Sequence, residues 1–387
     1  MRAYLDHCAT TPLAPAALAA MRPYLEGCLG NASSPHAWGR AARAALEGAR
    51  AAVARALGAR DPQTVVFVSG GTEADNLAVK GAARAGAGRG RHLVVSAIEH
   101  HAVLEAAAAL EAEGFAVSRV PPSGDGRVDP GAVEGALRPD TVLAAVMLVN
   151  NETGAIQPVA EIAARCRARG VLLHADCVQA LGSLPLDVEA LGVDLAAFSA
   201  HKAYGPQGIG ALYVRPGTPM RALLHGGFQE RSRRAGTESV AAAVGFARAA
   251  QLAAGSLAED GARMAALRDR LERGLVAAAP GARVNAAGAP RAPHVTSLAF
   301  EGVAAESLLI ALDLEGVAAS AGAACSSGSL EPSHVLQAMG LPPDRCAASI
   351  RFSLGRGTTA EEIDYAIAVV VQAVERLRAA LPAGAPA

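Results

Sequence analysis

Between Thr64 and Val214 the chain alternates strand-length apolar runs with stretches of helical pattern, and this alternation limits the fold more than any other feature. Most of these runs are apolar at nearly every position, which is the pattern of strands that are buried on both faces. Parallel sheets bury their strands in this way because crossover helices cover both faces. The sequence therefore predicts an α/β domain with helices near 72–85, 102–113 and 159–169. The runs read TVVFV, HLVVS, FAVSRV, TVLAAVMLV, VLLHA, DLAAFS and IGALYV.

The length of 387 residues exceeds what a single hydrophobic core usually holds, so a second, smaller domain is expected. After about Ala254 the pattern changes to a long helix over 261–278 that is rich in Arg, Ala, Leu and Glu, followed by shorter mixed elements. The sequence therefore places a domain boundary near Gly255.

The charge balance excludes several classes of partner. With 35 basic and 36 acidic residues, the net charge of -1 offers no electrostatic footprint for a nucleic acid or an anionic membrane surface. The longest aliphatic run near the middle of the chain, VLAAVMLV, is far shorter than the roughly 20 residues that span a bilayer. Small substrates and protein partners are expected instead.

The N-terminus and the cysteines suggest a cytoplasmic protein. Asp6 and His7 interrupt the chain before any apolar run forms, so neither a signal peptide nor a transit peptide is indicated. The cysteines are widely spaced and include no C-x-x-C pair, so neither a disulfide framework nor a metal site is expected. They are Cys8, Cys28, Cys166, Cys177, Cys325 and Cys346.

Polar groups follow the predicted strands at their carboxyl ends, where α/β sheets bind ligands. After TVVFV comes SGGTEADN, in which Gly71 and Thr72 open a helix and offer backbone N–H groups and a hydroxyl to a phosphate. Taken alone, this motif is more readily explained as an ordinary helix-capping turn. The other strand ends must decide between the two interpretations.

Three further strand ends carry side chains of a binding site. His100 or His101 follows LVVS and could face the cleft, although paired histidines at a helix start are more often solvated or capping groups. Asn151 follows VMLV, and Asp176 and Gln179 follow VLLHA. A carboxylate that ends a buried strand is costly unless it meets a cation or a strong donor. Asp176 therefore requires a partner.

Lys202 is the most informative charged residue. Within AHKAYGPQGIG it carries the only full charge between Asp194 and Arg215. Apolar surroundings lower the pKa of an ammonium and make the free amine available for Schiff-base chemistry. A lone lysine would more readily be explained as a structural residue with a buried stem. The neighbouring polar strand ends favour the chemical role.

Together these groups match the requirements of pyridoxal 5'-phosphate. They supply a phosphate cradle, a lysine for covalent attachment, a carboxylate for the pyridinium nitrogen and a histidine that can stack on the ring. The protein would contribute orientation and electrostatics, with Asp176 keeping the ring nitrogen protonated.

The chain resembles the cysteine desulfurases of the class V aminotransferase group, within fold type I of the pyridoxal-phosphate enzymes. The resemblance implies a large domain with a mostly parallel mixed sheet over 14–255, a smaller α/β domain over 256–387, and an N-terminal segment, 1–13, that packs with the small domain. It runs nearly end to end, through YLDHCATTP, NASSPH, VSGGTEADN, EHHAV, VNNETGAIQP, HADCVQALG, FSAHKAYGPQGIGALYVR, RRAGTES, ACSSGSLEPSHVL and IRFSLGRGTT.

The resemblance also implies a role for each candidate in the cofactor site. Lys202 looks like the lysine that attaches the cofactor, and His100 like the group that stacks on the ring and handles protons. Asp176 and Gln179 would hold the pyridine nitrogen and the ring hydroxyl. The phosphate would be held by Gly71, Thr72, Ser199, His201 and, from the other subunit of a homodimer, Thr237.

Substrate and sulfur roles follow from the same resemblance. Asn151 and Arg351, with Arg356 as a weaker candidate, would take the carboxylate of the substrate L-cysteine. Cys325 matches the cysteine that carries the sulfur as a persulfide, on a loop at about 320–332 that Gly322 and Gly328 allow to move.

The serine-rich ACSSGS motif resembles the subgroup that donates sulfur to iron–sulfur cluster assembly and to thio-cofactor or tRNA thiolation pathways. An iron–sulfur scaffold or another acceptor protein is therefore the implied partner. No resident metal is expected, although Cys325 could act as a transient iron–sulfur ligand together with a scaffold.

Two places depart from the family pattern. His7 and Cys8 stand where related sequences often have two asparagines, and Phe228 stands where a third glycine is expected. They bear on loop flexibility and substrate access.

Two alternatives stay open. A selenocysteine lyase or another class V aminotransferase could use the same scaffold, and Cys325 would then be dispensable. A catalytically idle scaffold would show damage to the lysine or the cofactor cradle, and the sequence shows none.

Overall fold

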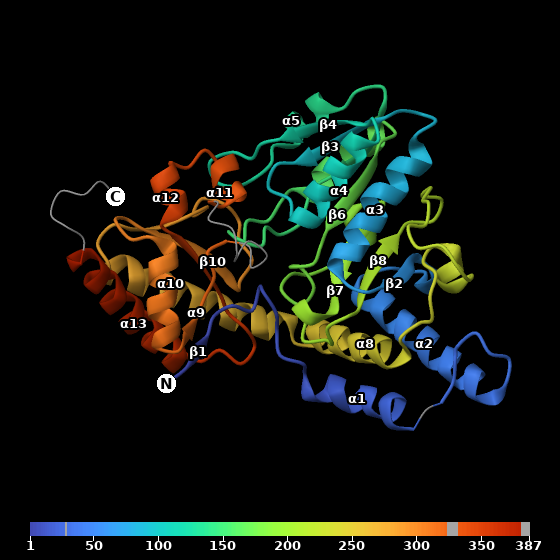
Figure 1. Ribbon diagram of the computed structural model, residues 1–387, viewed down its shortest axis with the longest axis horizontal. Coiled ribbons are helices and arrows are strands. Elements are labelled where there is room, and N and C mark those ends of the chain that lie inside the picture. Colours follow the sequence, from blue (N-terminus) through green and yellow to red (C-terminus); the bar gives the residue numbers. More distant parts are fainter. Residues whose placement is uncertain (28, 323–331, 381–387) are drawn as a thin grey trace.

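The computed structural model describes residues 1–27, 29–322 and 332–380. In this part of the chain two bodies lie side by side, the larger built around one sheet and the smaller around two (Figure 1).

The larger body contains a mixed, mostly parallel sheet. Its outer strand β2 and the neighbour β7 both run antiparallel to β8, and all other pairings are parallel. This arrangement confirms the predicted fold class. Among the described residues the sheet has seven strands, in the spatial order β2 (Val65–Val68), β8 (Gly210–Val214), β7 (Leu195–Ser199), β6 (Leu172–Asp176), β5 (Thr141–Ala145), β3 (His92–Ser96) and β4 (Ala116–Val120).

Both faces of this sheet are buried, as the unbroken apolar runs predict, except at the edge strand β4, which is partly exposed. In β2, Val65 and Phe67 belong to one hydrophobic cluster, whereas Val66 and Val68 belong to another on the opposite face. Side chains alternate between the faces of a strand, so each face needs its own covering layer. The cluster of Val66 contains residues of α3 (Gly71–Gly86) and α4 (His101–Ala112). The cluster of Val65 contains residues of α2 (Ala37–Ala56), α5 (Pro130–Ala136), α6 (Val159–Ala168) and α8 (Val240–Gly255).

The predicted helices of this body begin and end within one residue of their expected limits, but one strand is shorter than predicted. The run TVLAAVMLV forms a strand only as far as Ala145. Beyond that point the backbone N–H of Met147 donates to the carboxylate of Glu99, so the chain has left its neighbour β3. The remaining elements of the large body are α1 (Pro15–Glu26), α7 (Val188–Leu191) and the short 3-10 helices η1 (Pro62–Thr64), η2 (Ala200–Lys202) and η3 (Gln229–Ser232).

The smaller body combines a three-stranded antiparallel sheet with a two-stranded parallel one. In the first sheet β10 (Val295–Phe300) lies between β12 (Ser349–Ser353) and β9 (Ala282–Val284). In the second, β1 (Ala3–Tyr4) pairs with β11 (Val317–Ala318). The helices of this body are α9 (Leu257–Ala278), α10 (Ala305–Leu314), α11 (His334–Ala338), α12 (Pro343–Ala347) and α13 (Ala360–Ala379).

The N-terminal segment and the start of α9 bear on the domain division. Ala3 and Leu5 share a buried cluster with residues of α9, β10, β12 and α13. Helix α9 begins four residues earlier than predicted, and it is bent by 72° from α8. We propose that the bend marks the boundary near Gly255 and that residues 1–13 pack with the small domain. Within the described residues no single helix meets the length and hydropathy of a membrane span, and α8 with α9 meets them only as this bent pair.

Candidate active site

A cavity of about 210 Å³ lies where the carboxyl ends of β2, β3, β6 and β7 meet. It brings together ten of the residues that the sequence analysis singled out. The lining residues are Cys8, Ala9, Gly71, Thr72, Asp75, His100, Met147, Asn151, Asp176, Val178, Gln179, Ser199, His201, Lys202 and Arg351.

The N-terminus of α3 forms one wall of this cavity. Gly71 opens the helix, and a Cβ atom at this position would lie only 2.8 Å from Cγ2 of Val178. The same Cβ would lie 3.6 Å from Cβ of Ser199. Glycine therefore lets the edge of the sheet and the helix approach closely, and Gly71 and Thr72 line the cavity at the start of α3. An anion is the ligand that such a helix start favours.

His100 caps α4 with one ring nitrogen and leaves the other available. Its Nδ1 accepts a hydrogen bond from the backbone N–H of Ala102 at 3.1 Å, so the neutral ring carries its proton on Nε2. Burial, together with smaller contributions from the nearby charges of Lys202, His101 and His334, lowers the pKa of His100 to about 4. His100 is therefore a neutral imidazole at physiological pH.

Asp176 ends β6 with only 5% of its surface exposed. One carboxylate oxygen accepts a hydrogen bond from the N–H of Val178 at 2.9 Å. Burial raises the pKa of Asp176 to about 6, although the Val178 N–H and the charge of Lys202 act in the opposite direction. A buried carboxylate of this kind gains most from a cationic partner inside the cavity.

Lys202 lies at the end of η2, directly after β7. Its Nζ donates to the backbone oxygens of Cys8 at 2.5 Å and Ala9 at 2.7 Å. Gln179 Nε2 donates to the same Cys8 oxygen at 3.1 Å. Lys202 is one of only two lysines in the sequence, and the other, Lys80, lies on α3 outside the cavity lining.

Arg351 reaches the cavity from β12 of the smaller body and is 2% exposed. Its Nη2 donates to Asp6 at 2.8 Å, and its Nη1 donates to the backbone oxygen of Asn151 at 3.0 Å. Its buried Nε has no hydrogen-bond partner among the described residues. A buried donor without a partner is destabilising, and a carboxylate ligand would satisfy it.

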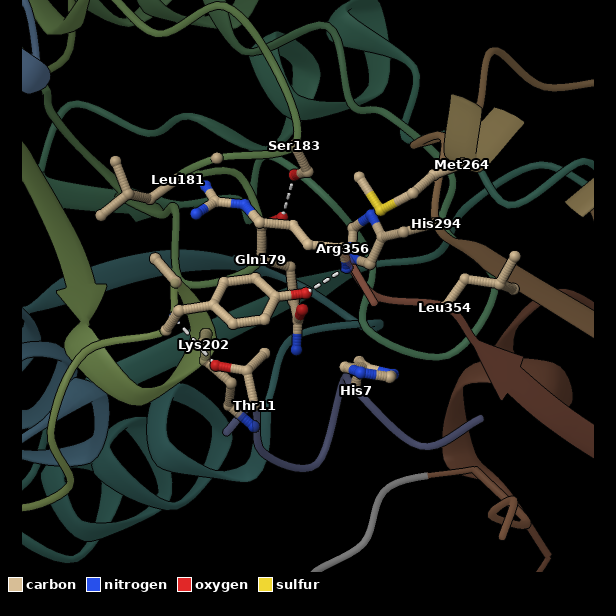
Figure 2. A pocket seen from close by; sticks show the side chains of 13 residues that line it. His7, Thr11, Gln179, Leu181, Ser183, Lys202, Met264, His294, Leu354 and Arg356 are labelled. Carbon is tan, nitrogen blue, oxygen red and sulfur yellow. Dashed lines mark hydrogen bonds between the residues drawn. The ribbon is translucent and has the colours of Figure 1, made fainter. Parts of the chain in front are cut away.

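Arg356 lies elsewhere. It lines a second, smaller cavity of about 30 Å³ that Lys202 and Gln179 also border (Figure 2). Its guanidinium carbon lies 4.6 Å from the centre of the Tyr204 ring, and its Nε pairs with Asp260 at 3.0 Å. The structure thus separates the two arginine candidates, with Arg351 in the larger cavity and Arg356 in the smaller one.

The remaining two candidates are not in the lining of the cavity. Thr237 is exposed, in the segment between η3 and α8 of the same chain. Cys325 lies outside the described residues.

The three departures from the family pattern lie in different surroundings. Cys8 lines the larger cavity, His7 borders the smaller one, and Phe228 is 89% exposed.

One cavity residue, Asp75, was missed by the sequence analysis. It faces the cavity from α3 and shares a hydrogen bond of 3.0 Å with Nε2 of His174. Burial raises its pKa well above the usual range, and the charges of Asp176 and Glu99 add to this effect. The sequence feature that could have identified Asp75 is a carboxylate on the apolar face of a predicted helix, one turn after Gly71 and Thr72. In the described part of the chain no group of three His, Cys, Asp or Glu side chains is placed to hold a metal ion.

Comparison with known proteins identifies the family. Residues 3–366 match the family described as aminotransferase class-V. A cysteine desulfurase IscS of Anaeromyxobacter dehalogenans is 48% identical over 382 residues, which cover 98% of this chain and 94% of the relative. A cysteine desulfurase IscS of Dictyoglomus turgidum is 44% identical over 379 residues, covering 98% and 96%.

Solved structures agree with the sequence relatives. A structure described as a NifS-like protein superposes with a TM-score of 0.90 at 36% identity and covers 97% of this chain and 100% of its own. A second, described as SspA in complex with cysteine, gives a TM-score of 0.80 at 31% identity and covers 92% and 100%. The chain therefore belongs to the aminotransferase class-V family and, within it, to the cysteine desulfurases.

Proposed function

We propose that the protein is a pyridoxal-phosphate-dependent cysteine desulfurase. It converts L-cysteine into L-alanine and transfers the sulfur to Cys325 as a persulfide. One observation carries this proposal: a single cavity unites the N-terminus of α3, Asp176, Lys202 and a buried arginine with an unpartnered donor. The names of the relatives support the choice of L-cysteine as the substrate.

The residues present fit the cofactor. The open helix start at Gly71 and Thr72, joined by Ser199 and His201, would hold the phosphate. Asp176 would pair with the ring nitrogen, Gln179 with the ring hydroxyl, and His100 would stack on the ring. When bound, pyridoxal phosphate supplies an electron sink that weakens bonds near the substrate Cα.

Side chains of the protein would perform the remaining tasks. Arg351 and Asn151 bind the substrate carboxylate, because the guanidinium is already fixed by Asp6 and retains a free donor. Lys202 attaches the cofactor and moves the Cα proton. His100, neutral at physiological pH, accepts and returns a proton through Nε2.

Sulfur transfer completes the reaction. The thiolate of Cys325 attacks the substrate sulfur, so that an S–S bond forms while the C–S bond breaks. The electron pair of the broken bond stays with the carbon skeleton, which takes up protons and leaves as L-alanine. The persulfide on Cys325 then waits for a second protein that accepts the sulfur.

We further propose that the active unit is a homodimer in which Thr237 of one subunit completes the phosphate site of the other. In a single chain Thr237 is exposed and does not line the cavity, which is consistent with a role toward a second copy. An iron–sulfur scaffold or another sulfur-accepting protein is the proposed partner. The cytoplasm is the proposed compartment, since the cysteines in the described residues are all free thiols.

Product analysis tests the proposed reaction. The purified protein, loaded with pyridoxal phosphate, is incubated with L-cysteine and a thiol reductant. Equal amounts of alanine and sulfide are expected. Formation of a 2-oxo acid with an amino-group acceptor would instead identify an aminotransferase, and turnover of selenocysteine without turnover of cysteine would identify a selenocysteine lyase.

A further inference from the structure

Three consecutive residues with side chains adopt a left-handed backbone in the short helix η3. The φ angles of Glu230, Arg231 and Ser232 are 44°, 57° and 63°. This region disfavours any residue with a Cβ atom, and a run of such residues persists only where the surroundings fix it. The surroundings of η3 therefore indicate what the conformation is for.

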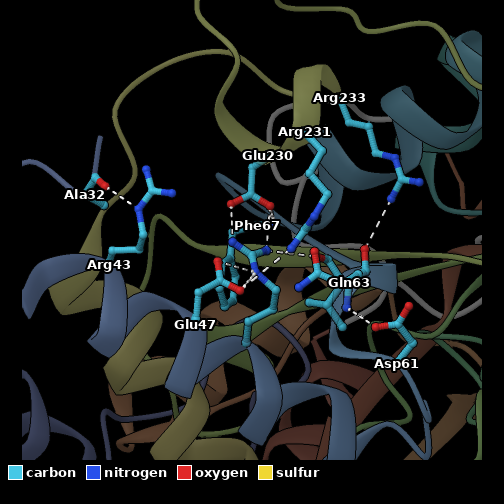
Figure 3. A network of polar contacts seen from close by, with 11 residues as sticks. Ala32, Arg43, Glu47, Asp61, Gln63, Phe67, Glu230, Arg231 and Arg233 are labelled. Carbon is cyan, nitrogen blue, oxygen red and sulfur yellow. Dashed lines mark hydrogen bonds and ion pairs between the residues drawn. The ribbon is translucent and has the colours of Figure 1, made fainter. Parts of the chain in front are cut away.

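Glu230 fixes this run through a buried ion pair (Figure 3). Its carboxylate accepts hydrogen bonds from both terminal nitrogens of Arg50, at 2.6 and 2.8 Å. It also accepts one from the backbone N–H of Phe67 at 3.0 Å. Glu230 is 5% exposed, so water does not compete for these bonds.

Arg50 is itself held in place on α2. Its guanidinium donates to the backbone oxygen of Val65 at 2.8 Å, pairs with Glu47 at 3.2 Å and lies 4.9 Å from the centre of the Phe67 ring. Val65 and Phe67 belong to β2, the strand that leads directly into the phosphate cradle at Gly71. Glu230 is therefore anchored to the same rigid unit that carries the cradle.

A second ion pair, four residues after Glu230, joins residues 230–234 to the phosphate cradle. Arg234 Nε donates to Glu73 at 2.9 Å, and the other oxygen of Glu73 accepts from the backbone N–H of Ser69 at 2.7 Å. Glu73 lies in the first turn of α3. Thr237 follows only three residues after Arg234, and it is exposed.

We propose that Glu230 is a positioning residue for the cofactor site of a second copy of this chain. It locks residues 230–234 onto their own cradle and thereby fixes the place at which Thr237 is presented to the phosphate bound by the partner. This inference rests on the proposed function, since Thr237 must contribute to a shared site. It goes beyond that function because Glu230 contacts neither substrate nor cofactor.

A double-mutant cycle separates this role from plain stabilisation. The homodimer loaded with pyridoxal phosphate is prepared as wild type, Glu230→Gln, Thr237→Ala and the double variant. The rate of cofactor loss is then followed by absorbance after dilution. Each single variant is expected to lose the cofactor about tenfold faster than wild type, the effect of one hydrogen bond to a charged group. The double variant is expected to be no faster than the faster single variant, because Glu230 acts through Thr237.

A matched control uses the second acid that pairs with Arg50. Glu47→Gln removes the same charge from the same arginine, but the Glu47 side chain is 41% exposed, and it meets residues 230–234 only through a long pair with Arg231 at 3.7 Å. Its cofactor loss is expected to stay within twofold of wild type. If Glu230→Gln does not yield folded dimer, Arg50→Lys replaces it, because lysine keeps the charge and loses the two-point geometry.

The outcomes distinguish this inference from the function on which it rests. If Thr237→Ala retains the cofactor like wild type, the shared site fails and the role of Glu230 fails with it. If Thr237→Ala loses the cofactor faster while Glu230→Gln does not, the shared site stands and the positioning role is wrong. Multiplicative effects in the double variant would likewise overturn the positioning role, since they would make Glu230 an independent stabilising anchor.

Discussion

Nζ of Lys202 donates a hydrogen bond of 2.5 Å to the backbone oxygen of Cys8. Cys8 belongs to the N-terminal segment, which pairs with the smaller body through β1 and through the bridge between Asp6 and Ser353. Lys202 of the larger body is therefore held by a segment that the smaller body anchors. Covalent attachment of a cofactor to Nζ must release at least one of its backbone contacts.

Replacement of Lys202 tests the attachment site. Lys202→Ala is expected to abolish covalent attachment of pyridoxal phosphate. The measurement is borohydride reduction of the loaded protein followed by mass spectrometry of its peptides. Lys80→Arg is the matched control, since Lys80 is the only other lysine of the sequence and should carry no label. Reduced cofactor on Lys80, or on neither lysine, would refute the assignment.

The raised pKa of Asp176 predicts that the folding stability of the cofactor-free protein depends on pH. The folded carboxyl titrates at about 6 rather than at the usual 3.8, so between these values the folded state holds a proton that the unfolded chain has released. The free energy of unfolding therefore falls as the pH rises through this window. The full loss, roughly 3 kcal/mol, is reached above about pH 6.

Asp176→Asn removes this loss of folding stability, because Asn keeps an oxygen for the Val178 N–H and carries no charge. The cofactor-free variant is expected to melt above wild type at pH 8, and the difference should shrink toward pH 4.5. The loaded variant should lose pyridoxal phosphate faster than wild type. Thermal melting at both pH values checks the first expectation. An equal melting difference at pH 4.5 and pH 8 would contradict it.

The two arginine candidates are distinguished by their cavities. Arg351→Lys should raise the KM for L-cysteine about 10- to 100-fold, the effect of a lost charge-assisted pair, and change kcat less. Arg356→Lys should change the KM little, because Arg356 lines the smaller cavity and pairs with Asp260. Steady-state kinetics of both variants decide the matter. A larger KM effect at Arg356 would reverse the assignment.

Mixed dimers test whether two subunits share each site. Subunits with Lys202→Ala retain Thr237, and subunits with Thr237→Ala retain Lys202, so a dimer of one of each contains one site with both residues. Alanine production by the mixed dimer is expected to exceed that of either parent homodimer and to approach half the wild-type value. No gain over the Thr237→Ala parent would exclude a shared site.

Much of the fold could be predicted from sequence because burial on both faces leaves a continuous apolar run. This holds for β2, in which every residue is buried. The same rule predicted that β5 continues to Val149, because Val146 to Val149 are also buried. The backbone bonds of that stretch go partly to the Glu99 carboxylate, and a sequence does not show where a strand parts from its neighbour.

The site was predictable where topology alone places residues together. Asp176 and Ser199 end their strands and Gly71 follows one, and the carboxyl ends of these strands share one edge of the sheet. The topology alone therefore predicts that these residues lie close together. Asp75 and Glu230 could not be found in this way. Their roles depend on His174 and Arg50, which lie 99 and 180 positions away in the sequence, and only the folded chain shows these contacts.

The most direct test concerns Cys325, because sulfur acceptance is assigned to this residue and the remaining chemistry to the cofactor site. Lys202, Asp176 and His100 are untouched in Cys325→Ala, so L-cysteine should still bind and change the absorbance of the loaded protein. Turnover should nevertheless collapse, since the weakened C–S bond has no attacking thiolate. Serine at 325 should not restore it, because a hydroxyl stays protonated at neutral pH.

The decisive measurement is alanine release from excess L-cysteine with a thiol reductant, wild type against Cys325→Ala. Wild type is expected to produce alanine steadily, and the variant at no more than a few per cent of that rate, with an unchanged absorbance response to L-cysteine. Alanine production by Cys325→Ala near the wild-type rate would show that Cys325 does not accept the sulfur and would favour a lyase in which this thiol is dispensable.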